Sequence, residues 1–269
     1  MSSLPHSYLF VPGNRPERFS KAYAAGAGAV IIDLEDAVPA AEKIAARAAL
    51  KAWLSPEQAV LVRINGADTE WFEGDLELCR LPGVAGIVLP KAEQVEQIVR
   101  AEMAGARAIL PLIESAAGFW NMRELALAPG VQRLVFGSID FQLDLGIDGE
   151  GEELLYFRSQ LVLVSRLAGL QPPVDGVSTA IDDESALHAD ALRARRLGFG
   201  AKLCIHPRQI AQVHQAFRPS EAQLAWARRV LEAAEAAQGA AVAVDGAMVD
   251  RPVILKAREM LAQSQRLDN

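Results

Sequence analysis

Several carboxylates and one arginine lie at the end of short apolar runs or directly after them. In α/β proteins, catalytic and binding side chains often lie at such positions. Glu114 follows the run 107–113, and Asp140 comes shortly after the run that ends at Phe136. Two carboxylates are the usual protein share of a Mg²⁺ site, in which water and substrate supply the other oxygens. Arg63 carries a planar fork that pairs with carboxylates. These residues predict Mg²⁺ on Glu114 and Asp140 and a dicarboxylate or 2-oxoacid bound by Arg63.

The same positions also fit plainer roles. Asp33, Glu35 and Asp36 cluster where another apolar run ends, and acidic residues there often cap a helix or form an ion pair. Arg63 could pair with one of these three. The chain has four histidines, none at His-x-x-x-His spacing, which argues against zinc or iron. We expect the three acidic residues to lie just behind the metal ligands and Arg63.

Eight short apolar, β-branched segments alternate with amphipathic segments and are predicted to be strands. Strands separated by helices pair in parallel, and eight such units predict a (β/α)8 TIM barrel. An open doubly wound sheet is the alternative, but no GxGxxG follows the first segment. In a barrel the polar residues above share the rim at the carboxyl ends of the strands. The predicted strands are 8–11, 29–34, 60–64, 86–89, 107–113, 133–136, 174–177 and 202–205.

The predicted helices include 15–25, 40–53, 92–103 and 185–197, and a loop of about ten residues is expected between residue 136 and a helix over 152–167. After the barrel we expect helices over 207–216 and 221–238, the latter capped by Ser220, with Trp226, Val230 and Leu231 on its packing face. A strand over 241–244, a turn at Gly246 and a last helix from about Pro252 follow. We expect a barrel over 1–218 and a helical appendage over 219–269, within one domain.

Composition narrows the class of protein. The chain has 269 residues, 34 acidic and 27 basic, with a net charge of −7. This balance argues against a nucleic-acid partner. No long apolar stretch predicts a membrane span, and the first residues do not read as a secretory signal. With two cysteines as well, we expect a cytoplasmic protein.

Ordered blocks across nearly the whole chain closely resemble the citrate lyase β-subunit-like family of the HpcH/HpaI aldolase superfamily, which includes malyl-CoA and citramalyl-CoA lyases. The blocks are LFVPGNRPERF (9–19), IDLEDAV (32–38), VRIN (62–65), VLPK (88–91), PLIES (111–115), FGSID (136–140), KLCIHP (202–207) and DGAMVD (245–250).

The resemblance implies a Mg²⁺-dependent (β/α)8 barrel, a homotrimer or hexamer, with Glu114 and Asp140 as metal ligands and Arg63 as the substrate-binding arginine. It implies that Arg15 and Lys21, with His206, contact CoA. It also implies that Asp250 is the acid/base on the acyl methyl group, reaching a neighbouring subunit's site.

Together these features predict a carbon–carbon lyase that acts on a 3-hydroxyacyl thioester such as citryl-, malyl- or citramalyl-CoA. The oxoacid would be oxaloacetate, pyruvate or glyoxylate, with backbone N–H groups of Gly137 and Ser138 as further donors to its carboxylate. Two alternatives remain. One is an aldolase for 4-hydroxy-2-oxoacids. The other is a β-like subunit that is non-catalytic or works only in a complex with an acyl carrier protein.

Overall fold

The computed structural model describes residues 4–236 and 242–268. The chain divides into two compact units, Leu4–His214 and a unit that begins at Gln215. The predicted boundary after residue 218 stays a prediction. In the described residues, no helix combines the length and apolar character needed to cross a membrane.

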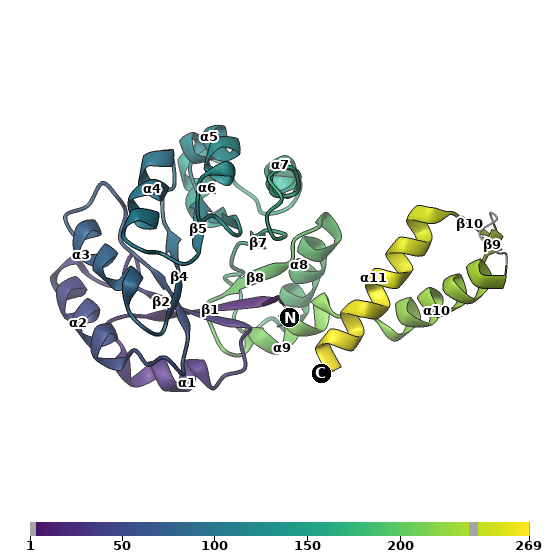
Figure 1. Cartoon of the computed structure of the whole chain (residues 1–269), viewed down its shortest axis with the longest axis horizontal. Coiled ribbons are helices and arrows are strands. Elements are labelled where there is room, and N and C mark those ends of the chain that lie inside the picture. Colours follow the sequence, from purple (N-terminus) through teal and green to yellow (C-terminus); the bar gives the residue numbers. More distant parts are fainter. Residues whose placement is uncertain (1–3, 237–241, 269) are drawn as a thin grey trace. The chain divides into compact units, whose positions relative to one another are not determined.

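The first unit is a closed barrel of eight parallel strands in sequence order, with β1 pairing with both β2 and β8 (Figure 1). This confirms the (β/α)8 prediction over the open sheet, since an open sheet would leave two edge strands unpaired. Each strand overlaps its predicted segment. The strands are β1 (Ser7–Pro12), β2 (Ala29–Asp33), β3 (Val60–Arg63), β4 (Val84–Leu89), β5 (Ile109–Ile113), β6 (Val135–Phe136), β7 (Val174–Asp175) and β8 (Ala201–Cys204).

Alternate strand residues point into the barrel and fill it with apolar side chains. The other residues face the helices, so both faces of most strands are buried. The interior cluster includes Tyr8, Ile31, Leu61, Val88, Leu110, Leu112, Val135, Val174 and Leu203. Above this layer, Phe10 and Val177 pack partly buried toward the rim that carries the polar residues.

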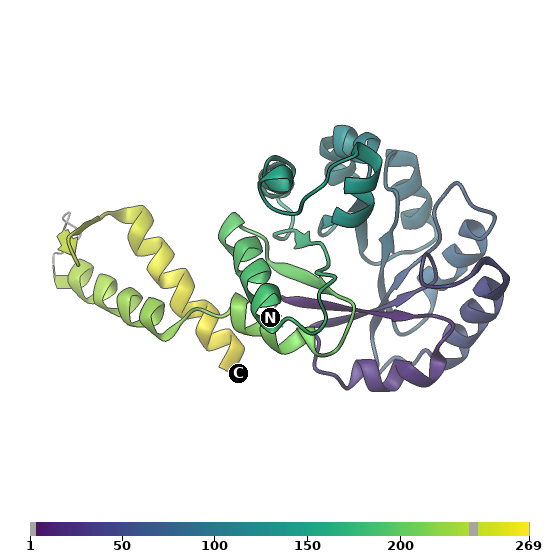
Figure 2. The same ribbon diagram turned by 180° about the vertical axis from the view of Figure 1, so that it is seen from behind.

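Helices and short 3-10 turns surround the barrel (Figure 2). The predicted first helix is a 3-10 turn, Pro16–Arg18, followed by the short α1. The helix expected from residue 92 begins at Val95, where Gln94 and Gln97 form a reciprocal cap. The helices are α1 (Phe19–Tyr23), α2 (Lys43–Trp53), α3 (Phe72–Leu76), α4 (Val95–Met103), α5 (Ala116–Leu127), α6 (Ser138–Leu145), α7 (Leu155–Leu167), α8 (Glu184–Leu197) and α9 (Gln209–Phe217).

The loop expected after β6 is wrong, because α6 starts at once. Its first turn carries Asp140, whose charge suits a helix N-terminus. Phe141 is fully buried, and Gly146 ends the helix in the left-handed conformation, at φ 67°. The sequence does not indicate this helix because one buried apolar position and a short length leave little periodicity to detect.

The C-terminal unit has its own small core. α10 (Glu221–Ala236) packs on α11 (Arg251–Asp268), with Val230 buried and Trp226 and Leu231 partly buried, as predicted. Ser220 caps α10 by accepting a hydrogen bond from the Gln223 N–H at 3.2 Å. β9 (Val242–Val244) and β10 (Ala247–Val249) form a hairpin that turns at Gly246. The predicted helix end at 238 and strand start at 241 lie outside the described residues.

Candidate active site

Arg63, at the end of β3, is held by carboxylates from the end of β2. Its Nε and one Nη donate to the two oxygens of Asp33 at 2.7 and 2.6 Å. The other Nη lies 2.9 Å from Glu35 Oε2 and 3.5 Å from Asp36. The guanidinium also stacks 4.9 Å from the centre of the Phe10 ring. The three acidic residues therefore contact Arg63 directly, and Asp36, which is exposed, is the partner that a substrate anion could most readily replace.

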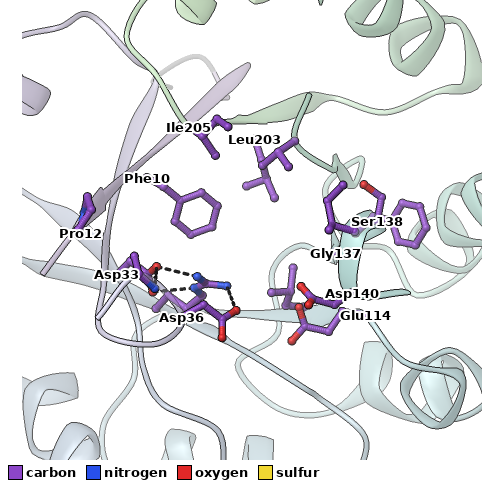
Figure 3. A pocket seen from close by; sticks show the side chains of 16 residues that line it. Phe10, Pro12, Asp33, Asp36, Glu114, Gly137, Ser138, Asp140, Leu203 and Ile205 are labelled. Atoms are coloured by element: carbon purple, nitrogen blue, oxygen red, sulfur yellow. Dashed lines mark hydrogen bonds and ion pairs between the residues drawn. The ribbon is translucent and has the colours of Figure 1, made fainter. Parts of the chain in front are cut away.

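Glu114 and Asp140 line the same cavity as Arg63 (Figure 3). Glu114 follows β5 and is buried, whereas Asp140 is exposed on the first turn of α6. The cavity has a volume of about 400 Å³ and is otherwise walled largely by apolar side chains of the barrel mouth. These side chains belong to Phe10, Leu112, Phe136, Val177, Leu203 and Ile205. A small anionic substrate would thus meet its charged partners at one end of an apolar chamber.

Burial and mutual repulsion favour the neutral forms of these carboxyl groups. Burial, with the nearby Glu35 and Asp140 charges, raises the pKa of Glu114 to about 8. Burial also raises the pKa of Glu35 to about 7, although Arg63 opposes the shift. Partial burial at the mouth of the cavity and the negative charge of Asp36 raise the pKa of Asp140. The Oε2 atom of Glu35 is buried, and its contact with Arg63 at 2.9 Å is an ion pair without hydrogen-bond geometry. The cluster carries more negative charge than one arginine balances.

Two backbone positions fix Glu114. The Lys91 N–H donates to Glu114 Oε1 at 2.7 Å, and Lys91 is in the left-handed region at φ 45°. On the other side, a Cβ at Gly137 would lie 2.5 Å from Glu114 Cβ and 2.7 Å from Oε2. Lys91 was overlooked as a functional residue because its contribution is a backbone conformation, which its side chain does not reveal.

The two backbone N–H groups expected to donate to a substrate carboxylate, those of Gly137 and Ser138, differ in whether they are free to do so. The Gly137 N–H already donates to the Ile113 carbonyl at 3.0 Å, so it is not available to a substrate, and that part of the prediction is wrong. Ser138 opens α6 and lines the cavity. Its Oγ is buried without a hydrogen-bond partner. Ser138 is the better donor of the pair because a helix N-terminus leaves N–H groups unpaired.

A buried ionic network behind the cavity was not predicted. Lys202, fully buried on β8, donates to the Gly176 carbonyl at 2.8 Å and pairs with Asp190 of α8 at 2.8 Å. Its ammonium also lies 3.6 Å from Asp175, whose other oxygen accepts from Arg158 Nε at 2.9 Å. The network anchors the segment after β7 to α7 and α8. Its lysine and aspartates are far apart in sequence, so spacing gave no signal.

That segment forms one wall of the cavity. Ser178 is hydrogen-bonded to Asp190, and Val177 lines the cavity. A Cβ at Gly176 would lie 2.2 Å from Ser138 Oγ, so the segment and the start of α6 pack without room for a side chain. The network therefore sets the distance between β7 and the helix that carries Asp140.

Three comparisons place the chain among known proteins. A family model described as HpcH/HpaI aldolase/citrate lyase matches residues 6–207. The chain belongs to this family. It is 40% identical over 279 residues to a citrate lyase subunit beta-like protein of Deinococcus radiodurans, covering 97% of each chain. It is 35% identical to a (3S)-malyl-CoA thioesterase of Cereibacter sphaeroides, covering 97% of this chain and 95% of that one.

A solved structure of the same family is similar along the whole chain. It is the protein CitE of Mycobacterium tuberculosis in complex with magnesium, acetoacetate and coenzyme A. The TM-score is 0.88 at 37% identity, with 98% of this chain and 100% of that chain covered. The HpcH/HpaI resemblance and the barrel expected from the sequence are thereby confirmed, and the magnesium and coenzyme A are properties of that relative.

The donor set of this family member fits Mg²⁺. Glu114 and Asp140 offer two hard oxygen ligands in a place where their negative charges repel each other, and a divalent cation removes that repulsion. Across the described residues, no group of three or more His, Cys, Asp and Glu side chains is arranged to hold a metal. A metal bound here must therefore keep water or substrate among its ligands, as Mg²⁺ does and structural zinc does not.

The remaining predicted site residues lie away from the carboxylate pair or in the other unit. Arg15 and Lys21 are exposed, just before and within the helical segment that follows β1. His206 is half-buried after β8 and accepts a hydrogen bond from the Arg208 N–H at 3.2 Å. None of the three lines the cavity. Their contact with CoA stays a prediction.

Asp250 belongs to the C-terminal unit and has a structural role there. Its Oδ1 accepts a hydrogen bond from the Val253 N–H at 3.3 Å, so it caps α11. Its side chain is half-buried. The acid/base role stays a proposal.

Proposed function

We propose that the chain is a Mg²⁺-dependent carbon–carbon lyase. It cleaves a 3-hydroxyacyl thioester into a 2-oxoacid and an acyl thioester, or forms the 3-hydroxyacyl thioester from these two compounds. The observation that carries the proposal is the cavity in which Glu114 and Asp140 lie with Arg63. A carboxylate pair that favours a divalent cation, next to an arginine, suits an anionic oxoacid. The magnesium, acetoacetate and coenzyme A of the similar M. tuberculosis structure support the same substrate class.

Bound Mg²⁺ would supply Lewis-acid stabilisation of the oxygen that becomes negative as the carbon–carbon bond breaks or forms. The Lys91 N–H would hold the Glu114 carboxylate in place as a ligand, and Asp140 would offer a second carboxylate from the first turn of α6. Arg63 would bind the substrate carboxylate, which would replace Asp36 as the partner 3.5 Å from its Nη. Ser138 would donate to the same carboxylate from its N–H or its unpartnered Oγ.

In the cleavage direction, the bond between C2 and C3 of the acyl chain breaks and its electron pair stays on C2, next to the thioester carbonyl. The C3 hydroxyl gives its proton to solvent water, and its oxygen becomes the carbonyl oxygen of the oxoacid. We propose that Asp250 protonates C2, and that it removes a C2 proton in the condensation direction. Arg15, Lys21 and His206 are proposed to contact the CoA part of the thioester, with an acyl carrier protein as the alternative carrier.

Thioester hydrolysis is the second candidate activity, and the relative named (3S)-malyl-CoA thioesterase is the observation that favours it. The two reactions give different products. A lyase releases a 2-oxoacid and keeps the thioester bond. A thioesterase releases a free thiol and a hydroxyacid.

The test uses the purified full chain with Mg²⁺ and, in turn, citryl-CoA, malyl-CoA and citramalyl-CoA. Mass spectrometry would follow the acyl-CoA products, and a thiol reagent would follow free CoA. We expect an oxoacid and a shorter acyl-CoA in equal amounts, lost on chelation of Mg²⁺ and in Glu114→Gln. Free CoA without oxoacid would overturn the lyase in favour of hydrolysis, and no turnover of any ester would overturn both.

A further inference from the structure

Arg63 is supported by a helix that does not itself line the cavity. α2 lies on the outside of the barrel, and none of its residues is among those that line the cavity (Figure 1). Lys43 and Arg47, one turn apart on α2, reach the loops that follow β2 and β3. The first of these loops carries carboxylates that hold Arg63, and the second continues the strand that ends in Arg63. The contacts of α2 therefore bear on the proposed substrate-binding arginine.

Lys43 fixes the backbone of the loop after β2. The residue is 8% exposed, and its ammonium donates to the carbonyl oxygens of Leu34 and Glu35, both at 2.9 Å. The ammonium also lies 5.1 Å from the centre of the Trp71 ring, within cation–π distance. In residues 4–236 and 242–268, no carboxylate lies within ion-pair distance of it. The buried charge of Lys43 is thus satisfied by the backbone that it holds.

The same loop is held from its other side by Arg63 and Asp33. The Leu34 N–H donates to the Arg63 carbonyl at 2.9 Å, and the Glu35 N–H donates to Asp33 Oδ1 at 2.9 Å. Asp33 in turn accepts hydrogen bonds from the Arg63 guanidinium with both of its oxygens. Leu34 and Glu35 therefore each have their carbonyl on Lys43 and their N–H on the arginine or its partner. A shift of this backbone would move the carboxylates that orient the guanidinium.

Arg47 holds the chain that leaves Arg63. Its Nε donates to Asp75 Oδ1 at 2.6 Å, and one Nη donates to the Trp71 carbonyl at 2.9 Å. The other oxygen of Asp75 accepts from the backbone N–H and the side-chain amide of Asn65, at 2.9 and 2.6 Å. Asp75 and Asn65 are both 1% exposed. Because Asn65 is two residues after Arg63, α2 fixes the strand end that carries the arginine as well as the loop that orients it.

We infer that Lys43 and Arg47 are positioning residues, which set the direction in which Arg63 presents its guanidinium to a substrate carboxylate. The inference rests on the proposed role of Arg63 in substrate binding. Asp33 occupies Nε and one Nη of Arg63, so a substrate meets the other Nη. With a single nitrogen left for the substrate, a small displacement of the guanidinium is not compensated by a second donor.

The first test measures the binding of oxalate, a planar anion that resembles a 2-oxoacid, to the Mg²⁺-loaded full chain by calorimetry. We expect Lys43→Met to weaken oxalate binding roughly 10–100-fold. Mg²⁺ affinity should stay close to that of the wild type, because Glu114 and Asp140 are held by other elements. Lys51→Met, the same change on the exposed side of α2, is the matched control and should bind oxalate as the wild type does.

Oxalate binding needs no turnover, so an inactive chain would count against the proposed lyase and leave this test intact. Wild-type oxalate affinity in folded Lys43→Met would overturn the inference. A wild-type chain that does not bind oxalate would overturn it as well.

A double-variant cycle separates positioning from a general loss of packing. Arg63→Lys keeps the charge and removes the guanidinium, so nothing is left for Lys43 to orient. Adding Lys43→Met to this variant should therefore weaken oxalate binding no further. A general structural effect would lower the affinity by the same factor in both backgrounds, and that result would contradict positioning.

Arg47→Lys carries the test if Lys43→Met does not fold. A lysine keeps the charge but lacks the rigid fork that holds Asp75 and the Trp71 carbonyl together. We expect oxalate affinity to fall several-fold. Arg80→Lys is the matched control, since Arg80 also donates to a backbone carbonyl but does not line the cavity or contact the two loops. Wild-type oxalate affinity in Arg47→Lys would overturn the role of α2.

Discussion

Gly137 has no room for a side chain because Glu114 packs against its α-carbon. A methyl group there would lie 2.5 Å from Glu114 Cβ and 2.7 Å from Oε2. The glycine of the block FGSID thus acts on the proposed metal site through the ligand beside it, and its own N–H is used within the barrel.

Replacing Gly137 by alanine should displace Glu114. We expect Mg²⁺ affinity to fall roughly 10–100-fold, as when the support of a metal ligand is lost. Overpacking should also lower the free energy of unfolding by about 1–3 kcal/mol. Calorimetric Mg²⁺ titration and urea unfolding measure the two effects. Gly151→Ala is the matched control, since its nearest atom, Glu153 Oε2, is 3.5 Å from the new Cβ. Unchanged Mg²⁺ affinity in Gly137→Ala would contradict the arrangement.

Mg²⁺ binding should depend on pH between about 5 and 8. Glu114 and Glu35 have pKa values of about 8 and 7, both above the ordinary 4.5, so the metal-free folded state holds protons that the unfolded state has lost. Stability of the metal-free protein should therefore fall as pH rises from the unfolded to the folded pKa values. Mg²⁺ competes with these protons, so the rise in Tm that it causes should grow over the same range.

Thermal unfolding with and without Mg²⁺ across this pH range measures the effect. The control is Glu114→Gln, which cannot ionise and should show a small Mg²⁺-dependent shift at every pH. A shift in the wild type that stays constant from about pH 5 to 8 would rule out proton competition at this site.

Lys202→Met should be strongly destabilising because it leaves Asp175 and Asp190 buried without the ammonium between them. Breaking a buried ion pair from one side costs about 3–5 kcal/mol. Urea unfolding measures this loss, and adding Asp190→Asn to Lys202→Met should recover part of it. Lys51→Met, on the exposed side of α2, serves as the control. If the double variant were no more stable than Lys202→Met, the ion pair would not explain the loss.

Asp250→Asn should lower kcat by about 10²–10⁴ on any thioester that the chain cleaves, since proton transfer at C2 loses its acid/base. An asparagine still caps a helix, so α11 should remain folded. Circular dichroism checks the fold. Wild-type activity in this variant would exclude the role.

Mixing distinguishes whether Asp250 acts on its own subunit's site or on a neighbour's. If it reaches a neighbour, subunits of Asp250→Asn and Glu114→Gln that are unfolded and refolded together should regain activity. Random assembly of symmetric subunits restores about a quarter of the sites. No recovery in refolded mixed oligomers would place Asp250 at the site of its own chain.

The barrel could be predicted because each strand carries its own signal. Runs such as 30–34 and 108–113 are largely apolar, and both of their faces are buried. The loop expected where α6 lies was wrong because Phe141 is the only apolar side chain that this short helix buries. The helix predicted from residue 92 begins later, at Val95, because Gln94 caps it. A cap depends on backbone angles, which the sequence pattern does not give.

Patterns along the chain were enough to predict the eight strands, their parallel order, the family, and the grouping of Glu114, Asp140 and Arg63 at one rim. Strand order in a barrel follows chain order, so local patterns suffice for these conclusions. Three relationships came from the folded chain and not from any pattern in it. Asp33 holds Arg63, Lys91 and Gly137 fix Glu114, and Lys202 lies among buried aspartates. Those relationships join different strands and helices, and they depend on distances of a few ångströms that no spacing along the chain encodes.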